Sequence, residues 1–250
     1  MGGGPSALTY VGHATVLVEL AGVRLLTDPL LGKGILHVRR RVPLPVLGDL
    51  RPLDAILVSH AHRDHLDRDS LRQLAGECPV IVPRGAADLV RRSGAREVIE
   101  MDEGDRVTIR GVPVEALHAA HNGRRHPLSR HAASLGYLLH GPPNIYFAGD
   151  TDLFGGMAEL SGRVDLAVLP IWGWGPSVSA GHLDPTRAAE AVARIAPRLA
   201  VPIHWGTLRA WGAQRGLDPA APARQFARAV KSRAPSSEVR ILMPGERTEL

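Results

Sequence analysis

The run Ser-His-Ala-His-Arg-Asp-His at residues 59–65 constrains this chain more than any other feature of its sequence. It directly follows residues 54–58, a short apolar segment whose length and composition predict a buried strand. His60 and His62 are two positions apart, so an extended backbone points both imidazoles to the same side. The aspartate and the last histidine follow on the predicted turn before a helix, where they can reach a neighbouring position. Imidazole and carboxylate together suit Zn²⁺, Mn²⁺ or Fe²⁺, so the run predicts a metal site at a strand end.

Hydrophobic periodicity and turn residues predict the surrounding elements. The predicted strands cover residues 8–20 and 23–27 (a hairpin), 54–58, 80–83, 98–99, 106–109, 113–118, 134–139 and 145–150 (a second hairpin), 165–170, 199–203 and 238–243. The predicted helices cover residues 70–76, 86–92, 185–196, capped by Asp184, and 222–233. Residues 30–50, which Gly and Pro interrupt repeatedly, predict a long loop.

The two halves of the chain repeat one pattern. A hairpin that ends in Asp, at Asp28 and again at Asp150, comes before a strand that begins with Asp, at Asp54 and again at Asp165. Each of these strands leads to a loop and then to a helix. The repeat suggests two similar halves, each with a mixed sheet, packed sheet to sheet with helices outside. We therefore predict a single α/β domain over residues 1–250.

Composition limits the function classes. The single cysteine, Cys78, allows no intramolecular disulfide, which suits a reducing compartment. No apolar stretch approaches the roughly 20 residues of a membrane span, and no signal peptide is evident, so we expect a soluble cytoplasmic protein. The net charge of +5 suggests nucleic-acid binding, but only 4% of residues are aromatic, too few for a base-stacking surface. A small-molecule substrate is favoured, with no nucleic-acid partner.

The run at residues 60–65 resembles the H-x-H-x-D-H signature of the metallo-β-lactamase superfamily. The other residues that this family uses come in the expected order: His121 after a mid-chain strand, Asp150 at the end of a hairpin strand and His204 at the end of a late strand. The similarity extends across almost the whole chain. Residues 10–15, 27–29 and 181–185 further resemble the branch that contains the L-ascorbate-6-phosphate lactonases and the N-acyl-phosphatidylethanolamine-hydrolysing phospholipase D enzymes.

The resemblance implies a four-layer αββα sandwich and a hydrolase with two divalent metal ions. Zn²⁺ is favoured, with Mn²⁺ and Fe²⁺ as alternatives. The implied ligands are His60, His62 and His121 for the first ion and Asp64, His65 and His204 for the second, with Asp150 bridging the two. A hydroxide between two such ions would attack an ester-like bond, a lactone or a phosphoester of a small molecule. Asp64 and His182 are the expected catalytic residues.

Several assignments stay open at this stage. His118 also lies near the strand end that carries His121, although the loop after His121 resembles the ligand-bearing loop of the branch. His182 can equally be a surface or capping histidine. His13 can donate to a carboxylate such as Asp28. The remaining open positions are Trp172 and Trp174 as substrate wall or as packing, and His126 and His131 as edges of the pocket.

The apolar and basic segment at residues 31–47, with its Arg39–Arg41 run, has four open interpretations: a lid, a phosphate-steering rim, a membrane-surface patch or a contact in a homo-oligomer. For the whole chain, the alternative function is a phosphodiesterase of the phospholipase D kind or a nuclease. Further alternatives are an oxygen-reducing diiron protein and a metal-dependent scaffold. Because a phosphorylated or otherwise anionic substrate would explain arginine near the site, an anionic small molecule is the expected partner.

Overall fold

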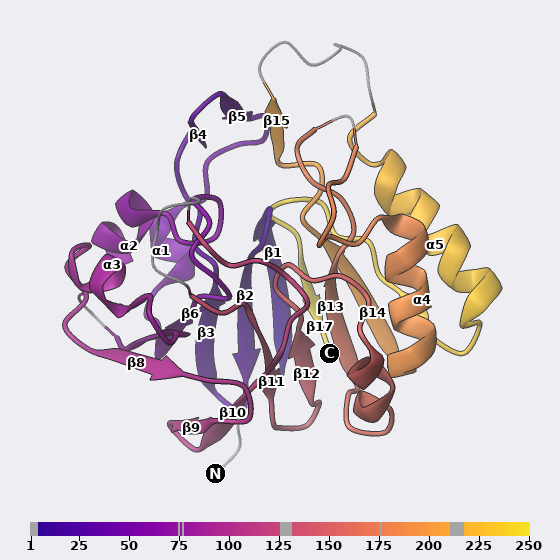
Figure 1. The fold of residues 1–250 in the computed structure, drawn as a ribbon, viewed down its shortest axis with the longest axis horizontal. Helices are drawn as coiled ribbons and strands as arrows, with labels where there is room; N and C mark the ends of the chain where they lie inside the picture. The colour runs from indigo at the N-terminus through magenta and orange to yellow at the C-terminus, as the bar shows by residue number, and fades with distance from the viewer. Residues whose placement is uncertain (1–4, 75, 77, 126–131, 176, 211–217) are drawn as a thin grey trace.

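Two mixed sheets form the centre of the molecule in the computed structural model, which describes residues 5–74, 76, 78–125, 132–175, 177–210 and 218–250 (Figure 1). The first sheet has the order β17-β1-β2-β3-β6-β7-β8, and the second has the order β16-β14-β13-β12-β11-β10-β9. The first consists of β1 (Ala7–Gly12), β2 (Thr15–Leu20), β3 (Val23–Thr27), β6 (Ala55–Leu57), β7 (Val80–Pro83), β8 (Val98–Met101) and β17 (Arg247–Glu249). The second consists of β9 (Arg106–Ile109), β10 (Val112–His118), β11 (Leu135–Leu139), β12 (Ile145–Phe147), β13 (Leu166–Pro170), β14 (Leu199–Ile203) and β16 (Glu238–Val239).

Each sheet combines an antiparallel meander with a parallel part. In the first sheet, β1, β2 and β3 are antiparallel, and β3, β6, β7 and β8 are parallel. In the second, β9 to β12 are antiparallel, and β12, β13, β14 and β16 are parallel. The parallel strands β6, β13 and β14 are buried along their whole length, which explains their continuous apolar sequences. Parallel strands also place their carboxyl ends at one edge, where the polar loops of both sheets begin.

The helices lie outside the two sheets, so the predicted four-layer αββα sandwich is confirmed. Helices α1 (Leu47–Leu50), α2 (Arg68–Leu74) and α3 (Ala87–Arg91) lie on one side, and α4 (Pro185–Ile195) and α5 (Ala221–Arg233) lie on the other (Figure 1). A short 3₁₀ helix, η1 (Gly155–Leu160), contacts α4. Side chains such as Tyr10, Tyr137 and Phe226 fill the main core. Among the described residues, the structure contains no helix long and apolar enough to span a membrane.

Helix α4 begins where the sequence predicts. The Asp184 carboxylate accepts hydrogen bonds from the backbone N–H groups of Thr186 and Arg187, at 2.7 and 2.8 Å. Pro185 occupies the first turn, where a missing N–H costs nothing. The helix ends at Ala196, which adopts a left-handed conformation with φ +51°. This helix follows the segment that carries Trp172, Trp174 and His182.

Three predicted segments differ from the structure. The strand predicted over residues 8–20 is two strands, β1 and β2, which pair antiparallel. Residues 30–50 are not a continuous loop: β4 (Gly34–Ile35) and β5 (Val38–Arg40) form a hairpin, and β15 (Leu208–Ala210) pairs with β5 to complete a three-stranded sheet. The pairing partner lies far along the chain, so local sequence could not reveal it. The predicted strand at residues 238–243 stops at Val239, and β17 instead pairs with β1.

Candidate metal centre

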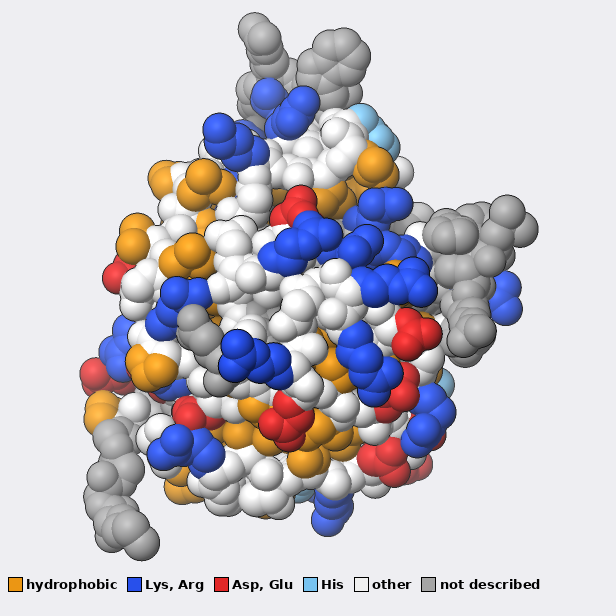
Figure 2. All heavy atoms as spheres, turned by 90° about the vertical axis from the view of Figure 1, so that its left-hand side faces the viewer, with side chains coloured by type: hydrophobic (Ala, Val, Ile, Leu, Met, Phe, Trp, Pro, Cys, Tyr) orange, Lys and Arg blue, Asp and Glu red, His pale blue; other side chains and the backbone are white. Residues whose placement is uncertain are grey.

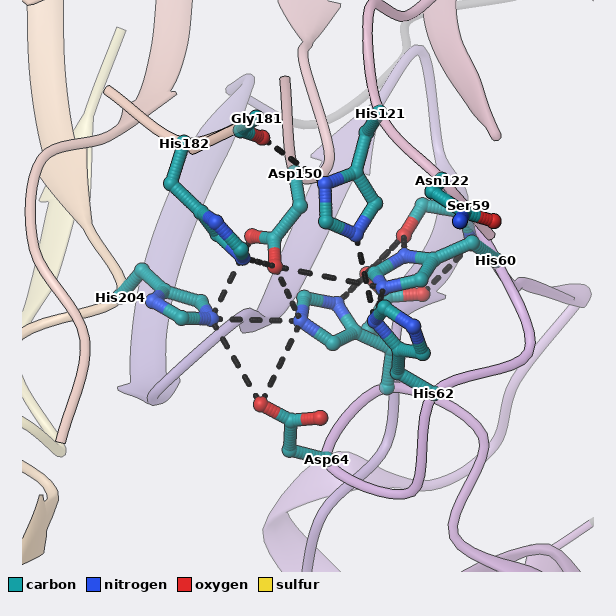
Figure 3. Close-up of polar contacts among 12 residues, drawn as sticks. Ser59, His60, His62, Asp64, His121, Asn122, Asp150, Gly181, His182 and His204 are labelled. Carbon is teal, nitrogen blue, oxygen red and sulfur yellow. Dashed lines mark hydrogen bonds and ion pairs between the residues drawn. The ribbon is translucent and has the colours of Figure 1, made fainter. Parts of the chain in front are cut away.

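The His-rich run leaves β6 at the carboxyl edge of the first sheet and turns into α2. His60 and His65 are fully buried there, and the half-buried His62 and Asp64 reach into the same space. The second sheet supplies the other predicted residues from its own strand ends: His121 after β10, Asp150 after β12 and His204 after β14 (Figure 3). Since the two sheets face each other, seven residues from four separate segments of the chain meet in one cluster. They are His60, His62, Asp64, His65, His121, Asp150 and His204.

His60, His62 and His121 form one corner of the cluster. The Nε2 atom of His60 lies 2.9 Å from Nδ1 of His62, and Nε2 of His121 lies 3.2 Å from the same Nδ1. The ring planes are close to perpendicular, so the nitrogens point toward a common position. One ligand atom from each of the three falls within 4.8 Å of the others. Tetrahedral zinc with Zn–N bonds of about 2.0–2.1 Å spaces its ligand nitrogens at about 3.3 Å, a separation close to these.

Asp64, His65 and His204 form the opposite corner. The Nε2 atoms of His65 and His204 are 3.2 Å apart, and Asp64 Oδ2 lies 3.8 and 3.9 Å from them. His13 joins this group, because its Nε2 lies 3.0 Å from Asp64 Oδ2. These four residues also meet the 4.8 Å criterion for ligand atoms.

Asp150 lies between the two corners. Its Oδ2 is 3.2 Å from His65 Nε2 and 4.0 Å from His60 Nε2, and its Oδ1 is 3.3 Å from His204 Nε2. Oδ1 is buried and has no hydrogen-bond partner among the described residues, in spite of the nearby imidazole. A buried carboxylate oxygen without a donor is costly, and a cation would satisfy it.

The tautomers of four histidines provide the sharpest test of whether a metal fits. His65 Nδ1 donates to Asp28 Oδ2 at 2.7 Å, His121 Nδ1 to the Gly181 carbonyl at 2.8 Å and His204 Nδ1 to the Trp172 carbonyl at 2.7 Å. His60 Nδ1 lies 3.0 Å from the Ser59 hydroxyl, which itself donates to Asp28. With Nδ1 protonated on each ring, a neutral imidazole turns its Nε2 lone pair into the cluster. Lone pairs at these separations repel one another unless a cation lies between them, so the donor set fits a metal.

The pKa values describe a site prepared for positive charge. Burial lowers the pKa of His121 to about 4 and that of His204 to about 3, and it also lowers the pKa of His60. Burial alone would raise the pKa values of Asp64 and Asp150, but the surrounding imidazoles outweigh it and both are lowered. At neutral pH these three histidines therefore offer lone pairs while the carboxylates are charged. The pKa of His65 is raised instead, because Asp150, Asp28 and Asp64 outweigh the effect of its burial.

Asp28 orients two residues of the His-rich run, Ser59 and His65. Its carboxylate accepts from the Ser59 backbone N–H at 2.7 Å and the Ser59 hydroxyl at 2.6 Å as well as from His65. His13, for which Asp28 was one possible carboxylate partner, lies against Asp64. The position of Asp28 at the end of β3, parallel to β6, was the available signal, because adjacent parallel strands end side by side.

Backbone conformation contributes to the same geometry. Gly149, immediately before Asp150, adopts φ +61°, and a Cβ atom there would lie 2.6 Å from Ser59 Cβ. Only glycine allows both the left-handed conformation and this close approach. His204 also has a positive φ, +66°, which turns its ring back toward His65.

The structure places two of the open histidines, His118 and His182, differently. His118 points away from the cluster, half exposed, with Nδ1 2.9 Å from Glu103 Oε2. His182 enters the cluster: its Nε2 lies 3.3 Å from Asp150 Oδ2, and its Nδ1 lies 3.0 Å from the Ser179 hydroxyl. It can also form a ligand group with His121 and Asp150. His126 and His131 lie outside the described residues.

Two cavities open beside the cluster and share His62 and His182. One, of about 780 Å³, is lined by Ala120, His121, Asn122, Arg124, Ala180 and Gly181 in addition to the shared pair. The other, of about 650 Å³, exposes Asp64, Asp150 and His204, and its apolar wall includes Trp172, Trp174, Ile35 and Leu36. Trp172 and Trp174 therefore do line a pocket. The structure places the β4–β5 hairpin over this cavity.

Arginines at the cavities differ from those we expected. The Arg39–Arg41 run does not line either cavity; the guanidinium of Arg40 instead donates to the carbonyls of Leu30 and Gly32. Arg63 and Arg125 line the cavity that Trp172 and Trp174 also line. Burial and the neighbouring Arg63 and Arg68 lower the pKa of Arg125. Figure 2 shows Lys and Arg side chains gathered on the face that carries helices α2 and α3.

Fold and site together define a metalloprotein whose centre lies where the strand ends of two stacked sheets meet. Residues 23–205 match the family model described as "Beta-lactamase superfamily domain", and the chain belongs to this superfamily, the metallo-β-lactamase superfamily. It is accordingly a metal-dependent hydrolase.

Curated relatives and solved structures agree with this assignment. A "UPF0173 metal-dependent hydrolase" of Caldivirga maquilingensis is 33% identical over 96% of this chain and 96% of its own length. "N-acyl-phosphatidylethanolamine-hydrolyzing phospholipase D 1" of Caenorhabditis elegans is 32% identical over 84% of this chain, which spans 67% of that protein. The solved structure of Igni18, a metallo hydrolase from Ignicoccus hospitalis, shares the fold, with a TM-score of 0.74, 23% identity and 99% of both chains covered.

Proposed function

We propose that this hydrolase uses two metal ions to cleave an ester-like bond in a small anionic substrate. The observation that carries the proposal is the convergence of Nε2 atoms on both sides of Asp150, each from a ring whose Nδ1 is engaged elsewhere. In this proposal the first ion is held by His60, His62 and His121, the second by Asp64, His65 and His204, with Asp150 between them. Zn²⁺ is the favoured ion, because imidazole nitrogens dominate the donor set.

A metal pair of this kind supplies a nucleophilic water at neutral pH and stabilises the charge that develops on the attacked group. The residues of this chain organise the rest. His182 lies at the junction of the two cavities, within 3.3 Å of Asp150, where it can give a proton to the leaving oxygen. Ser179 and the carbonyl of Ala180 hold its Nδ1 side. We therefore assign His182 as the catalytic acid, and Asp64 as a catalytic residue that acts from within the ligand set.

The cavity of about 650 Å³ supports the choice of substrate. Indole rings of Trp172 and Trp174 offer an apolar wall for an organic group, and Arg63 offers a positive charge at the rim. A lactone or a phosphoester of a small molecule that carries a negative charge matches both features. We infer no nucleic-acid substrate, and an oligonucleotide whose binding weakened steeply with salt would contradict this.

A phospholipase D-like phosphodiesterase is the second candidate. Two observations favour it: the similarity to the Caenorhabditis elegans enzyme of that name, and the apolar Leu36, which is 71% exposed beside the cavity. A phosphodiester would place its two substituents in the two cavities that meet at His182.

An activity panel distinguishes these candidates. Protein reconstituted with Zn²⁺, Mn²⁺ or Fe²⁺ is assayed on a lactone, a phosphomonoester, a phosphodiester and a carboxylic ester, each with and without an anionic group. Asp64→Ala and His204→Ala should abolish every activity found, and His118→Ala, matched in residue type but outside the cluster, should retain it. Activity that persists in both cluster variants would show that the catalytic site lies outside this cluster. Inactivity of the wild-type protein on the whole panel would favour a metal-dependent scaffold.

A further inference from the structure

Trp174 connects the wall of the 650 Å³ cavity with the metal centre. Its ring lines this cavity, and its indole N–H donates to Asp64 Oδ2 at 3.3 Å. Trp172, two residues earlier, lines the same cavity but reaches the cluster through its backbone, since its carbonyl accepts from His204 Nδ1. The two tryptophans therefore contact the centre in different ways, one by its side chain and one by its main chain.

The three-stranded sheet holds Trp174 in place. The Ala210 backbone N–H donates to the Trp174 carbonyl at 3.1 Å, which attaches the loop to β15. The indole packs against the small apolar cluster of Leu30, Val38 and Leu208. The His37 ring meets the indole edge-on, with ring centroids 5.7 Å apart. Residues from β5 and β15, and from the turn between β4 and β5, thus fix the position of a single indole N–H.

Asp64 needs this support, because little else holds its carboxylate. Among the described residues, the hydrogen bonds to Oδ2 come from His13 Nε2 at 3.0 Å and from Trp174. A carboxylate offers about four lone-pair positions, so both donors can remain while an ion takes another. Donors that orient a ligating carboxylate raise metal affinity by fixing its geometry in advance.

We propose that Trp174 is a positioning residue that orients Asp64 for metal binding, so that the three-stranded sheet and the apolar wall of the cavity are coupled to the metal centre. The inference rests on the proposed role of Asp64 as a ligand. It has a reciprocal consequence: an apolar ligand that contacts the indole changes metal affinity, and the metal changes the affinity for that ligand by the same factor.

The test compares Trp174→Phe with the matched variant Trp172→Phe. Phenylalanine keeps an aromatic ring in the wall at both positions and removes the N–H donor; only at Trp174 does that donor reach a ligand. Affinity for Zn²⁺ is measured by competition with a chromophoric chelator. In Trp174→Phe, we expect the site that contains Asp64 to lose about tenfold in affinity for Zn²⁺. Trp172→Phe should stay within about twofold of the wild type. The unfolding temperature of the metal-free protein should be similar in both.

A second variant tests the route through the hairpin. His37 is exposed and contacts the indole edge, so His37→Ala should weaken the same site by about two- to threefold without altering the cavity wall. Unchanged affinity in Trp174→Phe and His37→Ala, with two ions bound by the wild type, would overturn this inference alone. Failure of the wild type itself to bind a second ion would overturn the proposed function and this inference with it.

Discussion

Oδ2 of Asp28 lies 2.7 Å from Nδ1 of His65, and both side chains are fully buried. The carboxylate fixes the His65 tautomer and turns Nε2 toward Asp150. Asp28 is one of the innermost members of the site, because it also accepts two hydrogen bonds from Ser59, the residue that begins the His-rich run. The first sheet therefore orients its ligands through β3 as well as through β6, the strand that carries them.

Asp28→Asn should weaken metal binding by about 10- to 100-fold, because an amide can present its NH₂ group to Nδ1 and force the other tautomer. Chelator competition on the folded variant measures this. Ser70→Ala is a matched control, since it also removes a buried polar group near α2 but one that bonds Leu31 and Asp67 rather than a ligand. Equal affinities for Asp28→Asn and wild type would show that His65 needs no orienting carboxylate.

His182→Gln should lower kcat by about 100-fold while two ions stay bound, because the variant loses a proton donor rather than a proposed ligand. Substrates with good leaving groups need less protonation and should be affected less. Steady-state kinetics on a pair of esters that differ only in leaving-group pKa, with metal content measured on the same samples, tests this. Loss of one metal ion in His182→Gln would instead make His182 a ligand, which its grouping with His121 and Asp150 permits.

Arg63→Gln should raise KM for anionic substrates about tenfold and leave kcat nearly unchanged, because Arg63 is exposed at the cavity rim, where it can bind an anionic group away from the reacting atoms. A neutral analogue should show no difference. Arg39→Gln, on β5 and outside both cavities, is the matched exposed arginine. An equal effect of the two variants would assign the result to overall charge.

Glu115, away from the metal centre, joins three basic side chains: its carboxylate lies 2.8–3.0 Å from His140, Arg163 and Arg106. Burial would raise the pKa of Glu115, but these partners outweigh it and the pKa is lowered from 4.5. A depressed carboxyl pKa stabilises the fold above pH 4.5 and loses that effect as the pH falls through the folded-state value.

Glu115→Gln should therefore lower the free energy of unfolding by about 1–3 kcal/mol at pH 7 and by less at pH 3.5. Denaturant melts of metal-free protein at the two pH values measure the difference. The control is Glu159→Gln, which removes an exposed carboxylate in η1. The described residues show no salt bridge to Glu159. A penalty for Glu115→Gln that is independent of pH would mean that its packing, rather than its charge, stabilises the second sheet.

Local sequence marked the His-rich run at residues 60–65 as a metal site, and the family resemblance supplied His121, Asp150 and His204. Parallel strands deliver their carboxyl ends to one edge of a sheet, which explains why ligands from separate strands meet there. The four-layer sandwich followed from the same strands. The partner of each ligand was harder, because Asp28 reaches His65 only through the pairing of β3 with β6.

The part of the site that the sequence did not reveal depends on long-range pairing. The β4–β5 hairpin is short, and its third strand begins at Leu208, so no alternation of apolar and polar residues marks it. The sequence made Arg40 a candidate for a phosphate-steering rim. In the structure its guanidinium donates to the backbone carbonyls of Leu30 and Gly32. The hydrogen bond from Trp174 to Asp64 depends on this sheet, because the sheet holds the indole in place.

Metal content is the most direct test of the central claim. Protein reconstituted with Zn²⁺, freed of excess ion and analysed by mass spectrometry should contain about two ions per chain. His121→Ala should retain about one, because it removes one proposed ligand of the first ion only, and His118→Ala should retain two. Less than one equivalent in the wild type, or two in His121→Ala, would contradict a centre built from these two corners around Asp150.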